Sequence, residues 1–286
     1  MTSSAAPLPP LVSVPWLTEQ GTASDLLLFD ASWFLPTEPQ NALDAFRQAH
    51  IPGARFFDID AIADHESKLP HMVPTAAQFE RLTGALGIGD LHRVVFYDQK
   101  GIYSAPRAWW LMRLFGHERC AVLDGGLPQW RREGGALQQG EPAALPPTQP
   151  LASFNSRYLR GLGDMLDNLR TGRELVLDAR SADRFHARVP EPRAGLRAGH
   201  IPGSRNLPFT ELLTANQTLR APAQLRERFA ACGVDKAHTA VVTSCGSGMT
   251  AAILTLALEV AGFPVGGLYD GSWSEWGGRT DTPIER

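Results

Sequence analysis

The sequence is poor in cysteine and has little net charge. Its 286 residues include three cysteines, Cys120, Cys232 and Cys245, whose odd number and wide spacing argue against a disulfide framework and a zinc site. We therefore expect a reducing compartment and a cytoplasmic location. The net charge of −3 gives no general attraction to nucleic acid or to an anionic membrane, so we expect neither as a partner.

Long apolar segments are also scarce. The first ten residues lack the basic group and the apolar core of a secretory signal. One stretch, Thr239 to Leu258, runs for 20 residues without a charge, which is the length of a membrane span. Hydroxyl residues and glycines interrupt this stretch, so we interpret it as a buried strand, a loop and a buried helix.

Four short motifs occur twice in the same order, at offsets of 146 to 150 residues. The paired segments are 28–31 and 176–179, 50–55 and 200–205, 94–98 and 241–245, and 124–126 and 270–272. Four matches at nearly one offset indicate a tandem duplication. His50 and His200 occupy the same place in the two copies, so we expect both to be structural.

A proline-rich stretch separates the two copies. Residues 140–150 contain four prolines, which cannot continue a helix or a central strand. We therefore predict a first domain at residues 1–140, a linker at 141–150 and a second domain at 151–286.

Short β-rich runs alternate with helical patterns in each copy. In the second copy we predict strands at 175–178, 204–206, 240–244 and 265–269, and helices at 159–169, 222–231 and 251–261. This alternation predicts an α/β fold in which each domain is a mostly parallel sheet flanked by helices. Ligands of such sheets bind at the carboxyl ends of the strands.

Cys245 lies at one of these carboxyl ends, before a five-residue loop and a predicted helix. Gly246 and Gly248 allow the loop amides to turn inward, and amides at the start of a helix stabilise an anion. The loop therefore favours the thiolate form of Cys245 and a nucleophilic role. A cysteine after an apolar strand is also typical of an inert buried residue, which is how we interpret Cys120 and Cys232.

The duplicated His-Ile-Pro-Gly motif, the Asp-Gly-Gly and Asp-Gly-Ser-Trp motifs and the Cys-Gly-Ser-Gly-x-Thr loop resemble the tandem rhodanese-domain sulfurtransferases. The loop is similar to that of the 3-mercaptopyruvate sulfurtransferase branch. The resemblance covers nearly the whole chain and implies two tandem rhodanese-like domains, of which only the second is catalytic. Asp98 occupies the first-domain position that matches Cys245, and a carboxylate cannot carry sulfur.

The resemblance also implies the residues of a site. Cys245 would carry the sulfur, and Asp60 and His71 of the first domain would form a proton relay with Ser247. The loop after the cysteine would cradle the persulfide with residues Gly246, Ser247, Gly248, Met249 and Thr250.

The substrate clamp implied by the resemblance consists of Arg184 and Arg193. Guanidinium groups suit a carboxylate beside a ketone, because they form two parallel hydrogen bonds. Arg188 and Arg197 lie in the same stretch, so contacts from them to the substrate remain open.

The implied reaction moves sulfur from 3-mercaptopyruvate to thioredoxin, a small thiol or cyanide through a persulfide on Cys245, releases pyruvate and needs no metal or organic cofactor. A thiosulfate sulfurtransferase and a non-catalytic persulfide-binding module are the alternatives. The neutral loop favours a keto acid over the thiosulfate dianion. A cysteine-dependent phosphatase is excluded, because its loop requires an arginine where this chain has Ala251.

Overall fold

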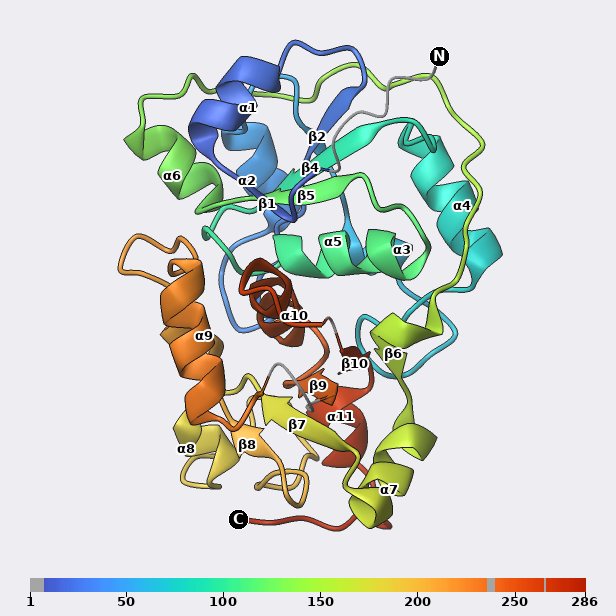
Figure 1. Cartoon of the computed structure of the whole chain (residues 1–286). Coiled ribbons are helices and arrows are strands. Elements are labelled where there is room, and N and C mark those ends of the chain that lie inside the picture. Colours follow the sequence, from blue (N-terminus) through green and yellow to red (C-terminus); the bar gives the residue numbers. More distant parts are fainter. Residues whose placement is uncertain (1–7, 236–239, 265) are drawn as a thin grey trace, which may run out of the picture.

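The two copies form two similar domains, each built on one parallel sheet (Figure 1). The computed structural model describes residues 8–235, 240–264 and 266–286. The five-stranded sheets have the orders β1-β5-β4-β2-β3 and β6-β10-β9-β7-β8, and every strand pair in the described ranges is parallel. The α/β fold predicted from the alternating pattern is therefore confirmed.

Strands and helices alternate along both halves of the chain. The first domain contains β1 (Leu11–Val12), α1 (Val14–Gln20), β2 (Leu26–Asp30), α2 (Ala42–Gln48), β3 (Arg55–Phe56), α3 (Ile59–Ile62), α4 (Ala76–Ala85), β4 (Arg93–Tyr97), α5 (Ala105–Leu114), β5 (Cys120–Leu123) and α6 (Gly126–Arg132). The second contains β6 (Leu159–Arg160), α7 (Leu162–Thr171), β7 (Glu174–Asp178), α8 (Ala182–Phe185), β8 (Arg205–Asn206), α9 (Pro222–Ala231), β9 (Ala240–Ser244), α10 (Ala251–Val260), β10 (Gly267–Tyr269) and α11 (Ser272–Trp276), with short 3-10 turns at Ser156–Tyr158 and Phe209–Leu212.

The predicted elements of the second copy are found with one correction. Leu159 and Arg160, expected at the start of a helix, form strand β6 against β10 instead. The helix begins only after Gly161, whose amide donates to the Asp164 carboxylate at 2.8 Å and so caps the first turn. The strand expected at 265–269 is observed at Gly267–Tyr269, and Val265 lies outside the described residues.

The duplication extends to strand register and to side-chain packing. Asp30 pairs with Tyr97 in the first sheet, as Asp178 pairs with Ser244 in the second. The rings of His50 and His200 stack on Phe46 and Phe185, and each histidine Nδ1 lies 2.9 Å from the carbonyl oxygen of the same phenylalanine. Both histidines thus occupy equivalent positions in the packing.

Helices α5 and α10 lie between the two sheets and pack against each other (Figure 1). An ion pair of 3.2 Å joins Arg113 of α5 to Glu259 of α10, and Trp109 and Trp110 are fully buried beside them. This packing explains the uncharged stretch in the sequence: its residues 240–258 are divided between β9, a loop and α10, and Thr239 lies outside the described residues. Within the described ranges, no helix has both the length and the hydropathy of a membrane span.

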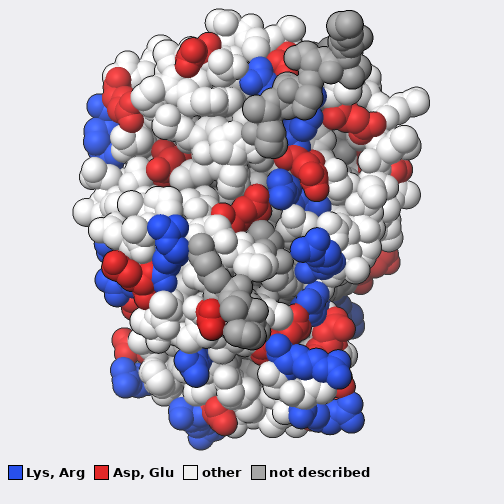
Figure 2. All heavy atoms as spheres, viewed as in Figure 1, with Lys and Arg blue, Asp and Glu red and all other residues white. Residues whose placement is uncertain are grey.

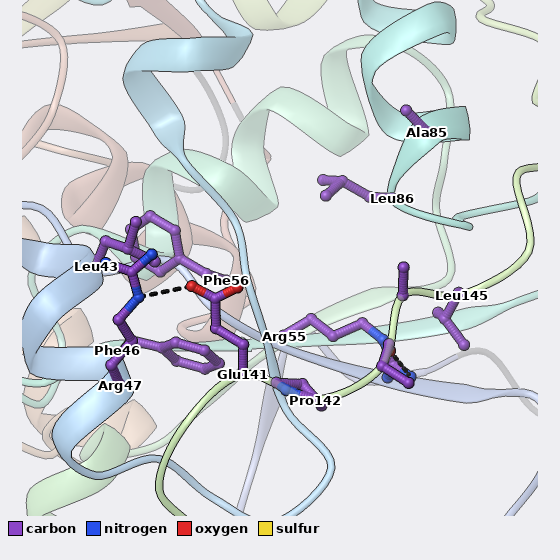
Figure 3. Close-up of a pocket in the computed structure, with 12 residues that line it drawn as sticks. Leu43, Phe46, Arg47, Arg55, Phe56, Ala85, Leu86, Glu141, Pro142 and Leu145 are labelled. Atoms are coloured by element: carbon purple, nitrogen blue, oxygen red, sulfur yellow. Dashed lines mark hydrogen bonds and ion pairs between the residues drawn. The ribbon is translucent and has the colours of Figure 1, made fainter.

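Residues 141–145, which belong to the predicted linker, line an apolar pocket of about 380 Å³ on the first domain (Figure 3). An ion pair of 2.6 Å between Arg47 and Glu141 and a hydrogen bond of 3.2 Å from Arg55 to the Ala143 carbonyl fasten the chain there. The pocket is lined chiefly by apolar side chains and contains no cysteine or histidine. On the face shown in Figure 2, basic and acidic side chains are interspersed.

Candidate active site

Cys245 lies where the sequence predicts, directly after β9 and before the loop that leads into α10. Its exposed fraction is 1%. The Cys245 carbonyl accepts a hydrogen bond from the amide of Trp273 at 3.0 Å, and the Gly246 carbonyl accepts one from Ser274 at 2.8 Å. Backbone hydrogen bonds from the amino end of α11 therefore hold the start of the loop in place.

Ser272, the first residue of α11, also holds the loop. Its hydroxyl oxygen accepts hydrogen bonds from the amides of Cys245 at 3.2 Å and Gly248 at 3.1 Å, and it donates to the Tyr269 carbonyl at 2.8 Å. The other amides of the loop are those of Gly246, Ser247, Met249 and Thr250. None of them donates a hydrogen bond to a protein atom in the part of the chain that the structure describes. These amides are available to an anion beside the cysteine.

The corresponding loop of the first domain holds a negative group of its own. One carboxylate oxygen of Asp98 accepts hydrogen bonds from the amides of Tyr103, Ser104 and Ala105 at 2.8, 2.9 and 3.0 Å. The amides of this loop therefore converge on a single anionic oxygen. In the second domain the shorter side chain of Cys245 occupies the equivalent position, which leaves the anion site open.

Two arginines face the loop beside the cysteine. A Cβ atom on Gly246 would lie 3.0 Å from Nη2 of Arg184 and 3.8 Å from Nη1 of Arg193, so both guanidinium groups lie close to the backbone that follows Cys245. Arg184 is held by the buried Glu191 at 2.5 Å, and Glu191 is also bonded to Arg180 at 2.8 Å. Arg193 forms no ion pair with any described carboxylate, and burial lowers its pKa. A desolvated cation without a partner is suited to an anionic ligand.

The other two arginines of the stretch lie elsewhere. Arg188 forms an exposed pair with Asp183 at 3.5 Å. Arg197 donates to the carbonyls of Trp276, Gly277 and Thr282, which fastens the end of the chain to the second domain. Neither side chain lines the pocket at Cys245.

His71 and Asp60 are brought together as the resemblance implies. Nδ1 of His71 lies 2.5 Å from Oδ1 of Asp60, and the other carboxylate oxygen accepts a hydrogen bond from the Trp33 indole at 2.8 Å. Burial disfavours the charged carboxylate, but the hydrogen bonds from His71 and Trp33 and the charges of His71 and Arg193 together lower the pKa of Asp60. Nε2 of His71 is buried without a partner in the described ranges, and no described hydrogen bond joins it to Ser247.

The pocket above Cys245 has a volume of about 350 Å³ and is lined by both domains. The sequence analysis missed its first-domain wall, which consists of Trp33, Leu35, Glu38, Lys100 and Tyr103. Burial, together with the negative groups nearby, raises the pKa of Tyr103 to about 12, so its hydroxyl remains a donor at neutral pH. No local motif marks these residues, because they reach the site only when the domains dock.

The other two cysteines lie outside this pocket. Cys120 is fully buried as predicted, and burial raises the pKa of its thiol. Cys232 is only half-buried, which corrects the expectation for it, and burial raises its pKa as well.

Comparison with known proteins identifies the fold and the repeat. The rhodanese-like domain matches this chain twice, at residues 13–133 and 162–279. The chain belongs to the rhodanese family. Each match begins just after the first strand of its sheet and spans the other four strands, so this is a tandem rhodanese protein.

Relatives of this rhodanese protein are similar to almost the whole of this chain. It is 41% identical to the 3-mercaptopyruvate sulfurtransferase of Escherichia coli K12, with 96% of this chain and 97% of the relative covered. It is 40% identical to the mitochondrial thiosulfate/3-mercaptopyruvate sulfurtransferase 1 of Arabidopsis thaliana, with 99% and 80% covered. The crystal structure of an E. coli 3-mercaptopyruvate sulfotransferase superposes with a TM-score of 0.83 at 38% identity, with 93% of this chain and 99% of that chain covered.

Proposed function

We propose that this chain is a sulfurtransferase that takes sulfur from 3-mercaptopyruvate, holds it as a persulfide on Cys245 and releases pyruvate. The observation that supports this most is that Arg184 and Arg193 lie beside Gly246, which follows the buried Cys245. A carboxylate and a ketone bound by Arg184 and Arg193 would place the substrate sulfur near Cys245. The proposal is further supported by the names of the relatives.

The first step forms one S–S bond and breaks one C–S bond. The Cys245 thiolate attacks the sulfur of 3-mercaptopyruvate, and the electron pair of the C–S bond remains on carbon as the pyruvate enolate. The enolate takes up one proton to give pyruvate. We assign this proton to a relay of Ser247, His71 and Asp60, because the bonded pair of His71 and Asp60 fixes the histidine ring.

The second step returns the cysteine to its starting state. The loop amides of Gly246, Ser247, Met249 and Thr250 stabilise the outer sulfur of the persulfide. A thiol acceptor, such as a small thiol or thioredoxin, or cyanide attacks the outer sulfur, and Cys245 leaves as a thiolate. No metal or organic cofactor takes part in either step, and we place the protein in the cytoplasm.

Thiosulfate is the second candidate donor, because the Arabidopsis relative is named for both compounds. The loop residues themselves are neutral, and Arg184 is already bonded to Glu191. A monoanionic keto acid therefore suits the site better than a dianion. A non-catalytic persulfide-binding module is the third candidate.

We predict that initial rates with 3-mercaptopyruvate exceed those with thiosulfate at equal concentration, with cyanide as the acceptor. The reason is that Arg184 is already bonded to Glu191, so Arg193 is the one member of the proposed clamp that has no carboxylate partner among the described residues. The rates would be compared in parallel on one preparation. A preference for thiosulfate would contradict 3-mercaptopyruvate as the sulfur donor. If neither donor gives a product, a non-catalytic binding module is favoured.

A further inference from the structure

The proposed site takes residues 245–250, here called the sulfur loop, from the second domain and the relay histidine, His71, from the first. Its function therefore depends on how the two domains are held against each other. Arg107 of α5, whose exposed fraction is 2%, lies at this junction. Its Nη2 donates to the main-chain carbonyl of His71, and its Nη1 lies 3.4 Å from the carbonyl of Gly248 in the sulfur loop. One guanidinium thus contacts the backbone on both sides of the site.

Asp270 completes this junction. One carboxylate oxygen lies 2.6 Å from Nη2 of Arg107, and the other accepts a hydrogen bond from the amide of Val73 at 2.8 Å. Asp270 is 4% exposed and stands just before the segment that holds the sulfur loop. The pair therefore joins the backbone around His71 to the second domain at several points.

The backbone of His71 needs such support. Its φ is 61°, in the left-handed region that residues other than glycine rarely adopt. A strained residue of this kind persists only where its surroundings fix it. The His71 carbonyl is bonded to Arg107, and the Val73 amide is bonded to Asp270.

The duplication provides an internal comparison. On the opposite side of the interface, Asp124 accepts a hydrogen bond from the amide of Leu219 at 2.8 Å. An offset of 146 residues relates this contact to the one between Asp270 and Val73. The same offset relates His71 to Gln217, whose φ is also positive, at 62°. At the same offset Arg107 corresponds to the apolar Ile253. Both sides therefore keep the aspartate contact, but the arginine is present only on the side that contains Cys245.

We propose that Arg107 is a positioning residue that sets His71 against the sulfur loop. This inference rests on the proposed function, since it explains how the relay histidine of that reaction is held in position. Arg107 acts through the backbone of His71 and Gly248 and does not touch the substrate. Asp270 holds the guanidinium in place.

A double-mutant cycle with Arg107→Lys and His71→Gln tests this role. Lysine keeps the charge but cannot form the same set of contacts, and a displacement of about 1 Å at a reacting group costs up to roughly 10²-fold in rate. We expect Arg107→Lys alone to lower kcat for 3-mercaptopyruvate by at least about tenfold and to leave KM within about twofold. In the His71→Gln background the same change should lower kcat by less than about twofold, because the two residues act as a unit.

The matched control is Asp124→Ala, which removes the equivalent contact on the side without the cysteine. It should lower the thermal midpoint and leave kcat unchanged. If Arg107→Lys lowers kcat by the same factor in both backgrounds, its role is structural and the proposal is overturned. Asp270→Asn, which keeps an acceptor for Val73, replaces Arg107→Lys in the cycle if the lysine variant does not fold.

A proton NMR measurement separates this inference from the proposed function. The short hydrogen bond between His71 and Asp60 should give a downfield signal that is lost in His71→Gln. We expect Arg107→Lys to shift or broaden this signal and Asp124→Ala to leave it in place. If the wild type does not turn over 3-mercaptopyruvate, the proposed function fails, and an unchanged signal in Arg107→Lys overturns the positioning role separately.

Discussion

Cys245→Ser is expected to abolish sulfur transfer, with a loss on the order of 10⁴-fold or more, as for the nucleophile of a covalent enzyme. A serine hydroxyl cannot form a persulfide, so neither proposed step can proceed. The substitution removes only the thiol from a loop that Ser272, Trp273 and Ser274 hold by its backbone. The fold should therefore remain, and initial rates with 3-mercaptopyruvate and a thiol acceptor measure the loss.

Cys120→Ser and Cys232→Ser are the matched controls. The Cys120 thiol lies 3.2 Å from the His117 carbonyl, and burial raises the pKa of both thiols, which disfavours the reactive thiolate. Both variants should keep near-normal specific activity, with some loss of stability for the fully buried Cys120. Retained transfer in Cys245→Ser would show that the sulfur carrier has been assigned to the wrong residue.

Arg193→Ala is expected to give the second large effect, a fall of roughly ten- to a hundredfold in kcat/KM for 3-mercaptopyruvate. Losing one charge-assisted contact to the substrate costs about 1.5–3 kcal/mol, and each 1.4 kcal/mol is about tenfold. Arg193 is the clearer of the two candidates, because no described carboxylate pairs with it. Steady-state kinetics over a range of substrate concentrations would measure the change.

Arg184→Ala should also reduce kcat/KM, but it would remove one of two partners of the buried Glu191. A loss of stability is therefore expected beside the loss of activity, and a thermal melt would separate the two. Arg188→Ala is the control, because this exposed side chain lies outside the pocket. Wild-type kinetics in Arg193→Ala would place the substrate clamp elsewhere.

The order of strands and helices could be predicted because local signals determine it. The run Ala240–Ser244 and the run that begins at Ala251 have the lengths and patterns of a buried strand and a buried helix, and both are observed with at most one residue of difference. Leu159 and Arg160 could not be assigned to a strand, because two residues have no period and their pairing with β10 is a long-range contact. The domain boundaries at residues 140 and 150 stay a prediction.

The sequence could suggest the positions of the candidate site residues only where a short motif surrounds the residue. The pairing of His71 with Asp60 and the positions of Arg184 and Arg193 follow the resemblance. Trp33, Tyr103 and Arg107 were missed, because only the docking of the domains brings the first two to the pocket at Cys245 and Arg107 to the Gly248 carbonyl. For Arg107 the internal repeat contains a usable signal. When the two copies are aligned at an offset of 146, this charged residue corresponds to the apolar Ile253.

The most direct test of a persulfide on Cys245 is the mass of the protein after a single addition of 3-mercaptopyruvate without an acceptor. We expect a gain of one sulfur atom, located on the peptide that contains Cys245, together with one equivalent of pyruvate. The added sulfur should be lost when a thiol or cyanide is supplied. An unchanged mass, or added sulfur on Cys120 or Cys232 instead, would contradict a persulfide mechanism at Cys245.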